Sequence, residues 1–221
     1  MTATTLIGDL IGSRGSTDRR ALHATFAAVL DRVNTELRPP TPVRMQVGDE
    51  YQGVFASLGD ALHASLTVRL ALLPTADVRH GIGRGSIEVL SEDPRVEDGP
   101  GWWAARAAIE RVEEAEGRPG ERSLRTAYVA AGGVGDDAGD GAADGWSSEE
   151  AAVNAALVLR DHLVSGLSER SLSVLRGLLD GESQRDLAEA LGISPSAVSQ
   201  RVRADGLAAI IAAHDLTRGM P

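Results

Sequence analysis

The chain has 221 residues, of which 43% are hydrophobic and only 3% aromatic, and its formal net charge is −10 at pH 7. It contains no cysteine, which excludes disulfides, thiolate metal sites and cysteine nucleophiles. All 22 basic residues are arginine, so a phosphate-binding loop built around lysine is excluded as well. The acidic balance argues against a non-specific nucleic-acid coat protein but allows a small DNA-reading module with one basic face.

Membrane and export signals are missing from the sequence. No apolar run approaches the roughly 18 residues that a membrane-spanning helix needs. The N-terminal segment lacks a basic region followed by a cleavage signal. We therefore expect a cytoplasmic protein that has no membrane partner.

Strand and helix patterns alternate over the first 131 residues. Short apolar runs that suit strands occur at 4–10, 43–47, 51–55, 78–83, 86–90 and 126–130. Apolar residues at helical spacing predict helices over 22–37, 58–73 and 102–116. We expect the strands at 78–83 and 86–90 to form a hairpin across Arg84 and Gly85.

This order of elements predicts an α+β fold with a ferredoxin-like, palm-type βαββαβ domain. In such a domain the helices pack on one face of a mostly antiparallel sheet, and the other face needs a cover. A second subunit often provides that cover, so we expect a homodimer.

A run of glycine, alanine and aspartate, AGGVGDDAGDGAADGW at 131–146, follows the last of these strands. Such a composition cannot bury enough apolar surface to offset the entropy of ordering it, which indicates a flexible linker. An EF-hand calcium loop starting at Asp136 is the alternative, but Ala138 stands where an oxygen ligand is needed. We therefore expect a ligand-binding domain at 1–131, a linker at 132–147 and a further domain at 148–221.

The segment after the linker is helical throughout, and its most specific motif is QRDLAEALGISPSAVSQRVR at 184–203. Gly192 ends one short helix, Ser194 is suited to cap the next, and Pro195 occupies the favoured first helical position. Two short helices joined by a glycine-bearing turn indicate a helix-turn-helix, so we expect an all-α DNA-binding domain at 148–221.

The second helix of this motif would enter the major groove of double-stranded DNA, the partner that we expect. Glutamine can read adenine there, and arginine can read guanine or bind phosphate. The residues that we expect to contact DNA are Gln184, Ser194, Ser196, Ala197, Ser199, Gln200, Arg201 and Arg203.

An ordinary helical hairpin that packs against the first domain is the alternative. Residues 149–221 hold 7 arginines against 10 acidic residues, so a single copy would bind DNA weakly. A dimer that reads two half-sites would raise the affinity. The preceding LSERSLSVLRGLLDGES at 167–183 resembles the lead helix of helix-turn-helix modules in sigma factors and response regulators.

Two acidic residues of the first domain are candidate metal ligands. Asp9 ends the first predicted strand, and Asp49 lies with Glu50 at the tip of the next hairpin. In a βαββ unit the first strand lies beside that hairpin, so both carboxylates can converge at one end of the sheet. Two carboxylates with phosphate and water oxygens suit Mg²⁺. As alternatives, Asp9 caps a turn and the hairpin tip is merely solvated.

The loop after Asp9 is a candidate phosphate site. Its residues are Leu10, Ile11, Gly12, Ser13 and Arg14. Backbone N–H groups in this loop and at the start of the following helix can hold a triphosphate, with Arg14 as the counter-charge.

Three segments together resemble the palm-like core of class III nucleotide cyclases: IGDLIGSR, VGDEYQGVF and VRHGIGRGSI. That resemblance implies that Asp9 and Asp49 are metal ligands and that the ligand is a nucleotide. More closely, IGD…SR, GDEYQG and DGPGWWAARAAIE resemble the SatD family of bacterial proteins over nearly the whole chain. The SatD resemblance implies a regulatory protein.

The chain departs from the cyclase pattern in two places. Cyclases carry a purine-selecting Lys or Glu shortly before the second Asp, where this chain has Arg44, Met45 and Gln46. They also carry an Asn and an Arg on the helix after the second hairpin. Here Arg106 can stand in for the arginine, while tryptophans occupy the asparagine region. The electrostatic clamp of phosphoryl transfer is therefore depleted, and we lean against an enzyme.

Other roles remain open for the residues of that helix. Arg106 can simply pair with Glu110, four residues on. Trp102 and Trp103 can stack on a base, fill a dimer interface or pack in the core, and core packing is the default.

The leading hypothesis is a transcriptional regulator whose palm domain senses a purine nucleotide or nucleotide second messenger with Mg²⁺. The rival is a cyclase-like or triphosphate-hydrolysing enzyme with a DNA-binding tail. A third possibility is an adaptor whose tail binds protein.

Overall fold

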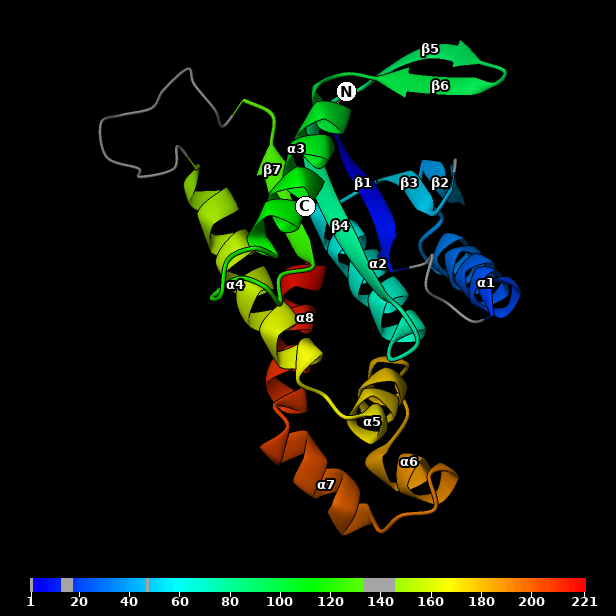
Figure 1. Ribbon diagram of the computed structural model, residues 1–221, viewed down its shortest axis with the longest axis vertical. Coiled ribbons are helices and arrows are strands. Elements are labelled where there is room, and N and C mark those ends of the chain that lie inside the picture. The colour runs from blue at the N-terminus through cyan, green and yellow to red at the C-terminus, as the bar shows by residue number, and fades with distance from the viewer. Residues whose placement is uncertain (1, 13–17, 47, 133–145) are drawn as a thin grey trace.

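The computed structural model describes residues 2–12, 18–46, 48–132 and 146–221. Strands and helices alternate in the first part of the chain, as β1 (Thr2–Ile11), α1 (Arg19–Leu37), β2 (Thr41–Met45), β3 (Glu50–Phe55), α2 (Leu58–Leu72), β4 (Asp77–Ser86), β5 (Glu88–Glu92), β6 (Arg95–Asp98), α3 (Pro100–Ala115) and β7 (Thr126–Ala130). Only helices follow, as α4 (Ser148–Ser165), α5 (Glu169–Leu179), α6 (Gln184–Ala190), α7 (Pro195–Ala204) and α8 (Leu207–Arg218). The expected α+β domain followed by an all-α region is confirmed (Figure 1).

The main sheet has the strand order β2-β3-β1-β4-β7. Its first four strands have the order and antiparallel pairing of a ferredoxin-like βαββαβ unit, with β1 between β3 and β4. β7 is added beside β4 in parallel, after the crossover helix α3. The palm-type topology expected from the sequence is therefore present, with one extra edge strand.

Helices cover both faces of this sheet. Leu6, Tyr51 and Ile82 lie on the face that packs against α1 and α2. Ile7 and Val54, on the opposite face, pack against α3. The expectation that one face is left for a second subunit is wrong for this part of the sheet, because α3 already covers it.

The expected hairpin across Arg84 and Gly85 is also wrong. β4 continues through both residues to Ser86, and the hairpin that follows is β5–β6, a separate two-stranded sheet. Glycines on one face of β4 let α3 lie directly on the strand. A Cβ on Gly81 would lie 2.1 Å from the carbonyl oxygen of Ala105, so no larger residue fits there.

Helix α4 runs along the outer edge of β7 and satisfies its backbone polar groups. The Asn154 side chain accepts from the N–H of Tyr128 at 3.0 Å and donates to its carbonyl at 2.8 Å. Glu150 accepts from the N–H of Ala130 at 2.8 Å, and Asp161 accepts from the N–H of Thr126 at 2.7 Å. Because these side chains replace a neighbouring strand, α4 is fixed to the sheet rather than tethered to it.

Helix α8 returns the chain to the sheet domain. The backbone N–H groups of Leu58 and Gly59, at the start of α2, donate to the carbonyls of Pro221 and Met220 at 3.2 and 3.1 Å. Arg218 pairs with Asp60 at 2.5 Å. The N-terminal end of α2 thus holds the C-terminal end of α8.

The C-terminal end of α2 belongs to a second hydrophobic core. Leu66 and Leu70 of α2 pack there with Leu172 and Leu175 of α5 and with residues of α6, α7 and α8. Arg176 of α5 donates to the carbonyl of Leu70 at 2.6 Å, which caps the end of α2. α2 therefore lies in the cores of both the sheet domain and the helical region.

Two further observations bear on expectations from composition. None of the helices in the described ranges is long and apolar enough to cross a membrane.

Most of the expected linker, residues 133–145, lies outside the described residues. At its end Ser147 is the N-cap of α4 and forms a capping box with Glu150. The domain boundaries expected from the sequence stay a prediction.

Candidate nucleotide site and DNA-reading helix

Asp9 does not end β1 but lies within it, because the strand continues two residues beyond Asp9 to Ile11. In register it is opposite Glu50 of β3 on one side and Arg79 of β4 on the other. Arg79 Nη1 donates to Asp9 Oδ2 at 3.2 Å. Since Arg79 also contacts α3 through Glu113, the Asp9 carboxylate lies on the α3 side of the sheet.

Carboxylates gather around Asp9. Burial is the main cause that raises the pKa of Asp9 above its ordinary value, and Arg79 opposes it. The charges of Glu113, Asp49 and Glu50 raise that pKa further. The sequence expectation that Asp9 and Asp49 come close to each other is therefore consistent with the electrostatics of the fold, and a cation at this point would relieve the repulsion.

Arg106 and Glu50 form an ion pair between α3 and β3. Arg106 Nη2 lies 3.7 Å from Glu50 Oε2, and both side chains are about half exposed. This cross-element contact places Arg106 beside the carboxylate cluster, and its role as the counterpart of the cyclase arginine stays a prediction. At this exposure the pair adds little to stability, so the arginine is available to an anionic ligand.

A cavity of about 360 Å³ lies beside Asp49 on the α1 side of the sheet. Its floor is apolar and its rim holds three side chains of α1 that can carry positive charge. The lining residues are Leu10, Leu22, Phe26 and Met45 on the floor, Arg19, Arg20 and His23 from α1, and Gly48 and Asp49 from the hairpin tip. The size and the mixed lining suit a small ligand with an apolar ring and an anionic group.

The loop expected to hold phosphate is only partly described. Leu10 is buried and lines the cavity, Ile11 ends β1, and Gly12 has φ = 72°. Gly12 therefore turns the chain in a conformation that favours glycine. Ser13 and Arg14 lie outside the described residues.

The N-terminus of α1 offers less to an anion than the sequence suggested. The Asp18 side chain caps the helix and accepts from the N–H of Ala21 at 2.8 Å. That carboxylate already occupies one of the free N–H groups and adds negative charge there. The exposed guanidinium groups of Arg19 and Arg20 are the better candidates for contacts with phosphate on this helix.

The expected site is thus divided by the sheet. Asp9, Glu50 and Arg106 lie toward α3, whereas Leu10 and Asp49 line the cavity next to α1. Asp49 directly precedes β3, which lies between β2 and β1, so it is at the end of that strand. A nucleotide in the cavity would reach the Asp9 carboxylate only around this end of the sheet.

The side chains around Asp9 meet only some of the requirements of a divalent cation. Asp9 Oδ1 is buried and has no hydrogen-bond partner, which leaves one carboxylate oxygen available to a cation. Within the described ranges, no group of three or more His, Asp or Glu side chains is placed to hold a metal ion. Mg²⁺ would therefore take most of its ligands from phosphate and water.

Sequence reasoning missed Arg79, Arg19 and Arg20. Arg79 stands in VRHGIG two residues before Gly81, so the glycines at every second residue could have indicated that Arg79 shares their face of the strand. Arg19 and Arg20 stand just before the helix predicted over 22–37 and follow a glycine-bearing loop. That position alone could have marked them as phosphate ligands.

The tryptophans of α3 have different roles. Trp102 is 8% exposed and packs with Ile7 and Val54, as the default of core packing predicted. Trp103 is 62% exposed, and its Nε1 donates to Asp98 at 2.9 Å. Neither tryptophan lines the cavity beside Asp49.

In the helical region, α6 and α7 form the expected helix-turn-helix. Ser194 caps α7 and accepts from the N–H of Ala197 at 3.2 Å, while Pro195 is the first helical residue. Val198 is fully buried against the helical core. The exposed side chains expected to contact DNA are Gln184, Ser194, Ser196, Gln200 and Arg203, whereas Ala197 and Ser199 are half-buried.

Arg201 differs from the other residues expected to contact DNA. Its Nη1 lies 3.4 Å from Ser171 Oγ of α5, and its Nε is buried. The side chain therefore packs between α7 and α5. Arg203, two residues on, is exposed and is the better candidate for a DNA contact.

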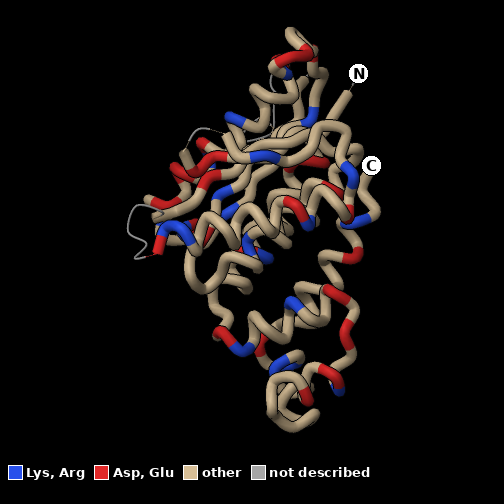
Figure 2. Tube along the Cα trace, turned by 90° about the vertical axis from the view of Figure 1, so that its right-hand side faces the viewer, with Lys and Arg blue, Asp and Glu red and all other residues tan. Residues whose placement is uncertain are grey.

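The charge around the recognition helix is mixed. Figure 2 shows acidic and basic residues interspersed along the helical end of the molecule. Because residues 149–221 hold 7 arginines against 10 acidic residues, a single copy of this region has no net positive charge to bind phosphates strongly. After α7 the chain continues as α8, and no strand follows β7 in the described residues, so the β-wing of winged helix-turn-helix proteins is absent from that part of the chain.

The fold and these features define a palm-type α+β domain joined to a helix-turn-helix region. The SatD family model matches residues 3–122, more than half of the chain, and the chain therefore belongs to the SatD family. A second model, described as winged helix-turn-helix DNA-binding, matches residues 180–204. No curated protein matches the chain.

Solved structures give weaker likenesses. A bacterial light-regulated adenylyl cyclase is 12% identical with a TM-score of 0.44, and the match covers 58% of this chain and 43% of that one, so this chain spans less than half of its length. The GGDEF domain of DgcB from Caulobacter crescentus, in complex with c-di-GMP, is 17% identical with a TM-score of 0.37, over 59% and 78% of the two chains. At these scores neither likeness bears on function.

Proposed function

We propose that this SatD family protein is a DNA-binding transcriptional regulator whose palm domain binds a purine nucleotide or nucleotide second messenger with Mg²⁺. The observation that carries the proposal is that the cavity beside Asp49 and the helix-turn-helix belong to parts of the chain that are packed together through α2. The cavity beside Asp49 opens on the sheet domain, and the exposed face of α7 belongs to helices that share a core with α2. Ligand occupancy and DNA affinity are then properties of one folded unit.

The cavity supports a nucleotide by its chemistry. Leu22 and Phe26 offer an apolar surface for a base, while Arg19 and Arg20 offer guanidinium groups for phosphate oxygens. Asp49 at the rim would hold Mg²⁺ together with those oxygens. The ion would neutralise phosphate charge, and the protein residues would position the phosphate group.

Titration calorimetry tests the ligand part of the proposal. The full chain is titrated with ATP, GTP and cyclic mono- and dinucleotides in turn, with and without Mg²⁺. We expect micromolar binding of one of them, weakened about tenfold by Asp49→Asn because one cation ligand is lost. Asp31→Asn removes an exposed acidic side chain of α1 outside the cavity and is the matched control. Absence of heat with every nucleotide would refute the ligand assignment.

Selection of bound duplexes from a random pool tests the DNA part. An enriched motif with two-fold symmetry would support both DNA recognition and a homodimer on two half-sites. If a pool without enrichment is recovered, the helix-turn-helix serves another purpose, such as binding protein.

The alternative is a cyclase-like or triphosphate-hydrolysing enzyme with a DNA-binding tail. The oxygen of Asp9 that has no partner favours it, since such an oxygen is available to a catalytic cation. Product analysis after long incubation with each triphosphate separates the two functions. Turnover that is lost in Asp49→Asn would establish the enzyme.

A further inference from the structure

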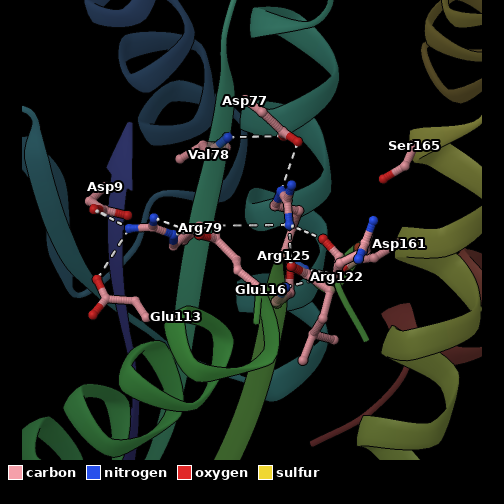
Figure 3. Close-up of polar contacts among 12 residues, drawn as sticks. Asp9, Asp77, Val78, Arg79, Glu113, Glu116, Arg122, Arg125, Asp161 and Ser165 are labelled. Atoms are coloured by element: carbon pink, nitrogen blue, oxygen red, sulfur yellow. Dashed lines mark hydrogen bonds and ion pairs between the residues drawn. The ribbon is translucent and has the colours of Figure 1, made fainter. Parts of the chain in front are cut away.

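A continuous series of ion pairs crosses the end of the sheet from Asp9 to α4 (Figure 3). Arginine and carboxylate alternate along it. We call this series the arginine–carboxylate ladder, and its members in order are Asp9, Arg79, Glu116, Arg125, Asp77, Arg69 and Asp161.

The first half of the ladder joins β1 to α3. Arg79 reaches Asp9 Oδ2 through Nη1 at 3.2 Å. It also binds the residue that follows the end of α3, Glu116, in a bidentate manner at 2.9 and 3.1 Å. The hydrogen bond to Glu116 is the largest of the causes that raise the pKa of Arg79. Arg79 is thus held from both sides.

The second half joins β4, α2 and α4. Arg125 donates to Asp77 Oδ2 at 2.9 Å, and Arg69 donates to Asp77 Oδ1 at 2.8 Å. Burial raises the pKa of Asp77, but Arg69 and Arg125 outweigh it and leave that pKa below its ordinary value. Arg69 then reaches Asp161 at 3.1 Å, and the side chains of both are buried.

Neighbouring arginines compete for shared oxygens along the ladder. Glu116 Oε1 lies 2.9 Å from Arg79 and 4.0 Å from Arg125. Asp77 Oδ2 accepts from Arg125 at 2.9 Å and from Arg69 at 3.3 Å. A change in one pair therefore alters the next, because an arginine that loses one carboxylate binds its other carboxylate more strongly.

The ladder ends where α4 is fixed to the sheet. Asp161 Oδ2 accepts from the backbone N–H groups of Arg125 and Thr126 at 2.8 and 2.7 Å. Residues 166–168 alone separate α4 from α5, the first helix packed around the helix-turn-helix. The hydrogen bonds of Asp161 to Arg125 and Thr126 therefore affect where α4, and with it the helix-turn-helix, lies relative to the sheet.

We propose that the arginine–carboxylate ladder couples the Asp9–Arg79 ion pair to the hold of Asp161, a residue of α4, on the backbone at the start of β7, and so regulates the helix-turn-helix. The regulatory meaning rests on the proposed function, but the coupling itself is a property of the free protein. When Arg79 loses the charge of Asp9 as a partner, Arg79 binds Glu116 more strongly and Arg125 turns to Asp77. Arg69 then gives up part of Asp77 and binds Asp161 more tightly.

Amide hydrogen exchange of the full chain without any ligand tests the coupling. Asp9→Asn keeps the shape of the side chain and removes its charge, which imitates a neutralised carboxylate. We expect the amides of Arg125 and Thr126 to exchange about threefold more slowly than in the wild type, the size of a modest coupling between charged neighbours. In the Glu116→Gln background, where the ladder is cut, Asp9→Asn is expected to have no effect on them.

Arg106→Gln is the matched control, since it removes a charge from the same carboxylate cluster without touching the ladder. It is expected to leave the two amides unchanged. An unchanged rate in Asp9→Asn, faster exchange, or an equal effect in the Glu116→Gln background would each overturn the coupling. These measurements need neither DNA nor nucleotide, so they test the coupling even if the proposed function is wrong.

Discussion

The Tyr51 hydroxyl and His80 Nε2 share a hydrogen bond across Gly8, the residue before Asp9. Tyr51 of β3 and His80 of β4 are both opposite Gly8 in register, and both are fully buried. Their rings lie edge to face, 5.8 Å apart. This pair spans the middle strand and helps fix β3 and β4 on either side of the residue that begins the ladder.

Gly8→Ala is expected to destabilise the fold strongly. A Cβ on Gly8 would lie 2.4 Å from two ring atoms of Tyr51, so the ring must move and the hydrogen bond to His80 breaks. Overpacking of this kind costs about 1–3 kcal/mol, and a buried group that loses its partner adds a similar amount. Urea unfolding measures the loss. Gly120→Ala, at a glycine with open space around it, is the control and is expected to stay within about 0.5 kcal/mol.

Stability is expected to fall as the pH drops from 7 to 5. Burial is the main cause that lowers the pKa of His80 to about 3, and burial with the charge of His63 lowers that of His214 to about 4. Over this range the unfolded chain gains protons on both residues and the folded chain does not, so acid favours unfolding. For the fully buried His80 the loss at pH 5 is on the order of 2 kcal/mol.

Urea midpoints at pH 7, 6 and 5 check this dependence. His80→Gln is expected to flatten the curve, and His23→Gln, at an exposed histidine, is expected to leave its slope unchanged. A slope that is the same in wild type and His80→Gln would contradict the role given to His80.

Asp161→Asn is expected to loosen α4 from the sheet. Asp161 is fully buried and holds Arg69 and Arg160 as well as two backbone N–H groups of the β7 edge. Removal of its charge leaves two buried arginines short of a partner, which costs about 3–5 kcal/mol. Thermal unfolding measures the cost. Asp186→Asn, at an exposed acid of α6, serves as the comparison and is expected to change little.

The outline of the fold was predictable because its strands and helices carry local periodicity. Apolar spacing indicated α1 and α2, and Ser194-Pro195 marked the start of α7. The end of β4 was not predictable, because glycines at 81, 83 and 85 indicate a turn in the sequence. Only the structure shows that these glycines make room for α3. A strand with no side chains on one face gives no hydrophobic alternation.

Of the expected site, only the closeness of Asp9 and Asp49 could be predicted, because neighbouring strands bring such residues together. That the two carboxylates bind a metal ion stays a prediction. The ladder joins residues far apart in sequence, such as Arg69 and Asp161, and no local pattern links them. Likewise Asn154 and Asp161 look like solvated positions of a helix, and only the position of β7 shows that they face a strand edge.

Gln200→Ala and Arg203→Ala are expected to weaken binding to a selected duplex, because both side chains are exposed on α7. Loss of a base contact costs about 1–3 kcal/mol, so each Kd is expected to rise about tenfold. Arg170→Ala, at an exposed arginine of α5, removes the same charge outside the recognition helix and is expected to change the Kd much less. Equal effects of Arg170→Ala and Arg203→Ala would show that only net charge matters.

The most direct test of the account is the Kd for the selected duplex, measured by fluorescence anisotropy with and without the nucleotide that binds in calorimetry, in the presence of Mg²⁺. Two sites coupled through one body shift each other's affinity, typically by fivefold or more. We expect such a shift for the wild type and its loss in Asp9→Ala. A Kd that stays the same at saturating nucleotide would contradict it.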